Sequence, residues 1–236
     1  MNSLYNSMVL TLHKRMDHGI EFVFNYTLSK AEDDGQVAGS NGTFDGTDYT
    51  IDPHNQKAMW GLSDLNQTNR VASSFVWKPE FAKNSSSQLA RTVVDGWTLS
   101  SIFSAATGQP VTGLISGTPS GAIDGGLTGG MVNNSGTAPS TYEDPSVPRN
   151  HYQGPGFWDI DARLARAFTV RERFRFTILA EAFNILNHTN VFSVSTTQYS
   201  LSGTTLSNVS TFLSPTATNN GLYGARQLQI SGRITI

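Results

Sequence analysis

The stretch that decides the fold is Ile20-Glu21-Phe22-Val23-Phe24-Asn25-Tyr26-Thr27-Leu28-Ser29, or IEFVFNYTLS. Its even positions are all apolar or aromatic, whereas its odd positions, apart from Val23, are polar or charged. Apolar residues at every second position are typical of a β-strand with two unlike faces. We therefore expect Ile20, Phe22, Phe24, Tyr26 and Leu28 on one face of a sheet and Glu21 on the other.

The same alternation recurs in six other segments, at residues 4–13, 71–77, 97–104, 158–165, 174–181 and 227–236. In residues 97–104 only Ile102 falls on the polar side. Helical periodicity does not compete in any of them, so the sequence predicts an all-β chain with seven long strands. The first two strands should be joined by a short turn at residues 15–19, where Gly19 permits a positive φ.

Strand and connector lengths favour a membrane barrel over a soluble sandwich. The runs are about 10 residues long, close to the 9–11 residues that cross a bilayer at a tilt. Short or moderate connectors (15–19, 78–96, 169–173) alternate with long ones (30–69, 106–156, 185–221). Outer-membrane barrels have this pattern, with turns on one rim and loops on the other. We predict an antiparallel transmembrane β-barrel fragment in the cell outer membrane.

The alternation also assigns side chains to the two faces of such a barrel. Those expected to face lipid are Ile20, Phe22, Phe24, Tyr26, Leu28, Trp77, Trp97, Phe174 and Phe176. Those expected to face the lumen or a plug are Glu21, Asp159, Asp161, Arg163, Arg175, Glu181 and Arg233. Arg163 decides the assignment, because an arginine facing lipid at the bilayer midplane costs about 2–4 kcal/mol.

Composition argues against several other classes of protein. The formal charge of −2 gives no electrostatic basis for binding nucleic acid, and the absence of cysteine excludes disulfides and thiolate sites. The histidines never fall at metal-ligand spacing, and no Gly-x-Ser-x-Gly motif positions a nucleophile. We therefore expect no enzyme activity, cofactor or metal. We interpret Asp45-Gly46-Thr47-Asp48, which lacks the EF-hand order, and the glycine-rich residues 121–130 as loops.

Seven strands do not close a bacterial barrel, because single-chain barrels have even strand numbers and an open sheet leaves two edges unpaired in lipid. The first six residues also have no signal-peptide pattern. We therefore interpret residues 1–236 as the C-terminal portion of a larger barrel. One alternative is a soluble β-rich binding module, such as a carbohydrate-binding sandwich, with its apolar face buried against a second sheet. Another is a small eight-stranded barrel, whose extra strand would come from Val191–Tyr199 or Leu206–Leu213.

Short motifs, in order along nearly the whole chain, resemble Oar-like TonB-dependent outer-membrane receptors. They are Leu4-Tyr5-Asn6, Leu12-His13-Lys14-Arg15, His18-Gly19-Ile20, Tyr26-Thr27-Leu28-Ser29-Lys30, Gly61-Leu62-Ser63-Asp64, Asn69-Arg70-Val71, Gly96-Trp97-Thr98-Leu99-Ser100, Thr107-Gly108-Gln109-Pro110, Asp159-Ile160-Asp161 and Glu181-Ala182-Phe183-Asn184-Ile185-Leu186-Asn187-His188. The resemblance implies a barrel of about 22 strands, of which these are the last seven. It implies that the partners are outer-membrane lipid, the N-terminal strands, a plug domain and, through the plug, the TonB system. It also implies uptake or export of a large or scarce solute.

Overall fold

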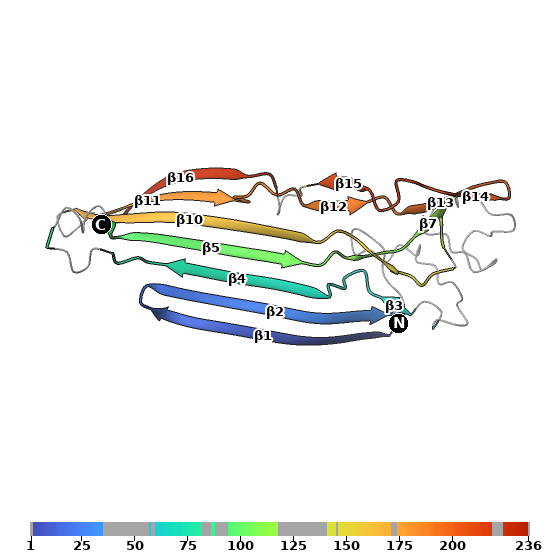
Figure 1. The fold of residues 1–236 in the computed structure, drawn as a ribbon, viewed down its shortest axis with the longest axis horizontal. Helices are drawn as coiled ribbons and strands as arrows, with labels where there is room; N and C mark the ends of the chain where they lie inside the picture. Colours follow the sequence, from blue (N-terminus) through green and yellow to red (C-terminus); the bar gives the residue numbers. More distant parts are fainter. Residues whose placement is uncertain are drawn as a thin grey trace.

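Seven long strands lie side by side in one antiparallel sheet (Figure 1). The structure is a computed structural model that describes residues 2–34, 57, 60–81, 86–87, 94–117, 141–144, 146–170, 174–218 and 224–235. The long strands are β1 (Ser3–Asp17), β2 (Ile20–Asp33), β4 (Asn69–Trp77), β5 (Trp97–Ala106), β10 (Phe157–Val170), β11 (Phe174–Phe183) and β16 (Gln227–Thr235). Within the described residues, no helix has the length and hydropathy needed to span a bilayer. The all-β prediction is therefore confirmed, and each long strand coincides with a segment of period two.

The long strands are neighbours in the order in which they occur in the chain, and the two-residue β3 (Gly61–Leu62) pairs with the end of β2. The first turn is tighter than the predicted residues 15–19, because β1 continues to Asp17 and only His18 and Gly19 connect the strands. Both residues have positive φ, 50° and 76°, as a two-residue hairpin turn requires. The Nζ of Lys14 donates to the carbonyls of Asp17 and Ile20 and so holds the two ends of the turn together.

The register aligns the apolar residues of all seven strands on one face. Residues directly opposite each other in an antiparallel pair project to the same side of the sheet. Across four strands, for example, Tyr26 is opposite Val71, Val71 is opposite Ala105, and Ala105 is opposite Trp158. By the same registers, all nine residues predicted to face lipid share this apolar face.

This apolar face has no protein layer packed over it. Figure 1 shows the long strands in a single layer, and many of their large apolar side chains are exposed, such as Ile230 at 83%. Among the described residues, Ala106 and Ile115 are the only hydrophobic residues that are buried. A sandwich would bury this face against a second sheet. The sheet instead has the exposed apolar band of a protein whose surrounding solvent is hydrocarbon.

Short strands gather at the end of the sheet that carries the long connectors and the N-terminus (Figure 1). They form three small sheets: β12 (Val191–Val194) with β15 (Pro215–Thr218), β6 (Pro110–Val111) with β9 (Tyr152–Gln153), and β14 (Thr205–Asn208), β13 (Thr197–Ser202), β7 (Leu114–Ser116) and β8 (Thr141–Glu143) in that order. The segments considered for an eighth long strand belong to these small sheets, so the described residues do not form a closed eight-stranded barrel. We call this end of the molecule the rim.

The sheet is open within the described residues, since β1 and β16 each pair on one side only. The two edge strands are first and seventh in an alternating order, so they run in the same direction, and the chain ends lie at opposite ends of the sheet (Figure 1). Each antiparallel neighbour runs in the reverse direction, so an odd number of further strands is needed to close the sheet between two edge strands that run the same way.

Two adjacent serines of β5 test the assignment of the faces. Ser101 lies on the apolar face, midway along β5, whereas Ser100 projects to the opposite face. Ser101→Arg should lower the free energy of unfolding in phospholipid vesicles by about 2–4 kcal/mol, because it places a guanidinium near the bilayer midplane. Ser100→Arg, the matched control, should change it by less than about 1 kcal/mol. Equal effects of the two substitutions would contradict the assignment.

Candidate functional site

The second face of the seven-stranded sheet, which we call the polar wall, carries all seven of the charged residues predicted to face the lumen or a plug. Asp159 and Asp161 lie in the half of β10 that is nearer the rim. Arg175 and Arg233 lie at the opposite end, where Arg175 is opposite Thr235 and Arg233 is opposite Thr177. Two neighbouring carboxylates therefore lie near the rim and two guanidinium groups lie at the opposite end, where Glu21, beside the first turn, also lies.

Near the middle of the wall the structure brings Arg163 and Glu181 together. They are directly opposite each other in the β10–β11 register. The Nη2 and Nε atoms of Arg163 lie 2.6 and 2.8 Å from Oε1 of Glu181. Because the arginine side chain is 54% exposed, the pair contributes only about 0–1 kcal/mol to stability, and its main effect is to fix two long side chains on the wall.

Two of the motifs that resemble Oar-like receptors contact each other where the wall meets the rim. The backbone N–H of Asn184 donates to Oδ1 of Asp161 at 2.9 Å, and the N–H of Ile185 donates to the carbonyl of Ile160. On the other face, the ring of His188 stacks on Trp158 with centroids 4.0 Å apart. The Asp159-Ile160-Asp161 motif thus anchors the chain as it leaves β11.

A second pair of motifs joins β4 to the segment after β5. The backbone N–H of Asn69 donates to Oγ1 of Thr107, and the N–H of Thr107 donates to the carbonyl of Asn69, at 3.1 and 3.0 Å. The next residue, Gly108, lies so close to the carbonyl of Gly154 that a Cβ atom would overlap it. The glycine of the Thr107-Gly108-Gln109-Pro110 motif is therefore needed for the close approach of two backbone segments.

Residues that the sequence reasoning missed hold the rim together. Arg149 forms a buried ion pair with Asp33, and its Nη2 also donates to the Asp33 carbonyl at 3.0 Å. Asn150, 2% exposed and at φ 57°, donates from Nδ2 to the carbonyl of Leu62 and to Oδ1 of Asp64. Arg149 and Asp33 are 116 positions apart, and no local pattern marks them as partners.

Asp34, just beyond β2, is tied to the start of β1. Its carboxylate accepts hydrogen bonds from the backbone N–H of Asn2 at 2.5 Å and from Asn2 Nδ2 at 2.6 Å. These bonds, the backbone one above all, hold the pKa of Asp34 below its usual value. The contact therefore favours the folded state above the normal pKa of an aspartate and loses strength as the pH falls through the lowered one.

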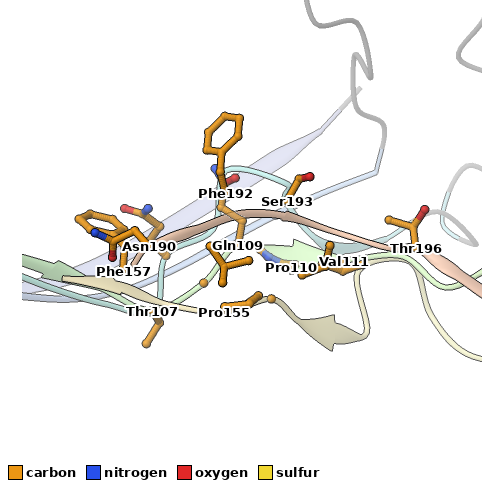
Figure 2. Close-up of a pocket in the computed structure, with 15 residues that line it drawn as sticks. Thr107, Gln109, Pro110, Val111, Pro155, Phe157, Asn190, Phe192, Ser193 and Thr196 are labelled. Atoms are coloured by element: carbon orange, nitrogen blue, oxygen red, sulfur yellow. The ribbon is translucent and has the colours of Figure 1, made fainter. Parts of the chain in front are cut away.

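A cavity of about 380 Å³ opens among the rim segments. Its lining comes from Gln67 and from residues within 107–111, 154–157 and 190–196, and Figure 2 shows Phe157 beside Asn190 at one end and Thr196 at the other. The ring of Phe192 projects away from the other labelled side chains and is 67% exposed. The lining mixes apolar surface with amide and hydroxyl groups and contains no charged residue, so it suits a neutral, partly apolar ligand group.

Residues 1–229 match the family described as outer membrane beta barrel domain. The chain belongs to this family. Together with the uncovered apolar face, membership places the barrel domain in the outer membrane. No match was found among curated proteins or among solved structures.

Two segments that we interpreted as loops from the sequence are not described by the structure. Asp45-Gly46-Thr47-Asp48 and the glycine-rich residues 121–130 lie outside the described residues. In the part of the chain that the structure describes, no group of three or more His, Asp or Glu side chains could hold a metal ion.

Removing one partner of the buried ion pair should loosen the rim. Arg149→Met leaves the Asp33 carboxylate buried without its counter-charge, a change that typically costs about 3–5 kcal/mol. The free energy of local opening, measured by amide hydrogen exchange at Tyr152 and Gln153, should fall accordingly. The double variant Asp33→Leu/Arg149→Met should recover most of the loss, since neither charge remains. Unchanged protection in Arg149→Met would show that the pair does not hold the rim.

Gly108→Ala should separate the two backbone segments beside the cavity. The added Cβ overlaps the Gly154 carbonyl, and such overpacking costs about 1–3 kcal/mol. Protection of the Gly154 amide, which donates to the Gln109 carbonyl at 2.9 Å, should fall by about tenfold or more in hydrogen exchange. Gly232→Ala is the matched control, because a Cβ there meets only the Phe176 ring at 3.6 Å. Normal protection in Gly108→Ala would refute the role given to this glycine.

Proposed function

We propose that this barrel domain is the C-terminal part of an Oar-like TonB-dependent receptor that moves a large or scarce solute across the outer membrane. The observation that carries the proposal is the open seven-stranded sheet with one apolar and one polar face. A barrel wall of this kind is incomplete alone and needs further strands at the edges of β1 and β16. A receptor barrel of about 22 strands meets this need, because the 15 strands then missing are an odd number.

Two further features support a plugged transporter over a simple pore. The polar wall carries fixed charges of both signs, including the Arg163–Glu181 pair, and such a surface can dock a folded polar domain inside the barrel. The motifs that resemble those of Oar-like receptors also contact each other at the rim. The long connectors would capture the solute, as loops held on a rigid scaffold often do.

The alternative, a soluble carbohydrate-binding-like module, is not favoured. It requires the apolar face to be the interior of a two-sheet core, and the described residues leave that face uncovered. We also propose that the domain acts without catalysing a reaction, through a lumen that its plug gates with energy from the TonB system.

The test uses the full-length protein in cells, where the absence of cysteine in this domain allows single-cysteine labelling. Ser74 of β4 lies on the polar wall, opposite Ile102, whereas Ser73 lies on the apolar face, opposite Phe103. Ser74→Cys should react slowly with a membrane-impermeant maleimide while the plug fills the lumen. Its rate should change when TonB is deleted or the proton-motive force is collapsed.

Ser73→Cys is the matched control and should stay unreactive in all conditions, because it faces lipid. If Ser74→Cys reacts rapidly and equally with and without TonB, the domain lines an open pore and the proposed receptor function is wrong.

A further inference from the structure

The polar wall contains a carboxyl group with one buried oxygen that has no hydrogen-bond partner among the described residues. Asp159 is 9% exposed, and its Oδ1 is buried with no hydrogen-bond partner among the described residues. A buried charged oxygen of this kind is costly unless something neutralises or coordinates it. It lines a pocket of about 180 Å³ between β10, the end of β11 and the start of β16.

The second carboxylate in this pocket, from Asp161, intensifies the need for positive charge. Asp159 and Asp161 are two positions apart on the same face of β10, and their carboxyl groups repel each other when charged and are close enough to share a hydrogen bond. Asp161 is fixed by the hydrogen bond from the Asn184 backbone to its Oδ1. The two negative groups are therefore held side by side.

The guanidinium groups near this pocket either contact other residues or lie on a more distant strand. Arg163, two residues along β10, forms the ion pair with Glu181, and Arg226 directs its Nη1 to the Ile185 carbonyl at 3.5 Å. Arg70 lies on the same face, but on β4, two strands away from β10. The residues that line the pocket include neither lysine nor arginine.

The remaining lining supplies oxygen atoms. Gln227, Gly224 and Ala225 also line the pocket, and they offer a side-chain amide and backbone carbonyl groups. Asn184 closes it by donating from Nδ2 to the carbonyls of His188 and Gly224, both at 2.8 Å. A donor set made only of carboxylate, amide and carbonyl oxygens is the kind that a hard divalent cation prefers.

We propose that Asp159 and Asp161 bind a calcium ion in this pocket, with the Gln227 amide and water completing the coordination. The ion neutralises the two carboxylates and links β10 to the start of β16 beneath the rim. Calcium fits better than magnesium, because irregular backbone and side-chain oxygens suit its flexible coordination, whereas magnesium requires near-ideal octahedral geometry. This site is independent of the TonB coupling proposed above.

The test uses the purified full-length protein in detergent, stripped of lipopolysaccharide and treated with a chelator. Adding Ca²⁺ should raise the midpoint of thermal unfolding, and Tb³⁺ should bind with luminescence sensitised by nearby aromatic rings. Asp159→Asn and Asp161→Asn should each weaken Tb³⁺ binding by about tenfold or more, since even the loss of an outer-shell partner weakens metal sites about 10–100-fold. Without Ca²⁺, the Asp159→Asn variant should have a midpoint of thermal unfolding equal to or above that of the parent protein, because the substitution removes the repulsion between the carboxylates of Asp159 and Asp161.

Asp17→Asn is the matched control, since Asp17 is the last residue of β1, at the opposite end of the sheet, with its side chain 66% exposed. It should keep the full response to Ca²⁺ and Tb³⁺. The site is refuted if Ca²⁺ does not stabilise the parent protein, if NaCl of equal ionic strength does so equally, or if the two pocket variants respond as the parent does. Equal stabilisation by NaCl would mean that the carboxylates respond only to general screening of charge. Unchanged responses of the two variants would mean that the carboxylates share a proton and bind no ion.

Discussion

The structure depends on one constraint, which is that hydrocarbon offers no hydrogen-bond partners to the peptide backbone. A strand meets this constraint only by pairing on both sides, so its side chains are free to face two different solvents. In this domain the pairing runs unbroken from β1 to β16. The usual distribution of residues is consequently reversed, because apolar side chains are outside and the buried positions are almost all polar.

At the rim the chain returns to water, and a different interaction takes over. Asn66, Asn150, Asn184 and Asn190 are each 2–4% exposed. An asparagine amide both donates and accepts, so it can satisfy irregular backbone that has no ladder partner. Asn66, for example, accepts from the Ala31 N–H through Oδ1 at 2.8 Å. Buried amides, with the Asp33–Arg149 pair, therefore do at the rim what strand pairing does in the membrane.

The sequence contained most of the strand architecture but little of the rim. Alternation in β2 identified its apolar face. In β5 the one residue that broke the pattern was also placed correctly, since Ile102 projects to the polar side and is 57% exposed there. The first turn was placed too early because Arg15 and Met16 interrupt the pattern, although β1 continues through them across a register shift. Contacts such as Arg149 with Asp33 were not predictable, because they depend on how long connectors meet in space. The buried Oδ1 of Asp159 without a hydrogen-bond partner among the described residues likewise appears only when its neighbours are placed.

The central claim is that the two faces of the sheet meet lipid and a polar lumen, and spin labels placed singly along β10 test it most directly. With the full-length protein in phospholipid vesicles, labels at residues 160, 162 and 164 should be accessible to oxygen, which partitions into lipid. Labels at residues 161, 163 and 165 should be shielded from it. The predicted result is an oxygen accessibility that alternates along β10, high at the even-numbered positions and low at the odd-numbered ones. Even-numbered positions that are shielded from oxygen would contradict the account, because they would mean that the apolar face is covered by protein.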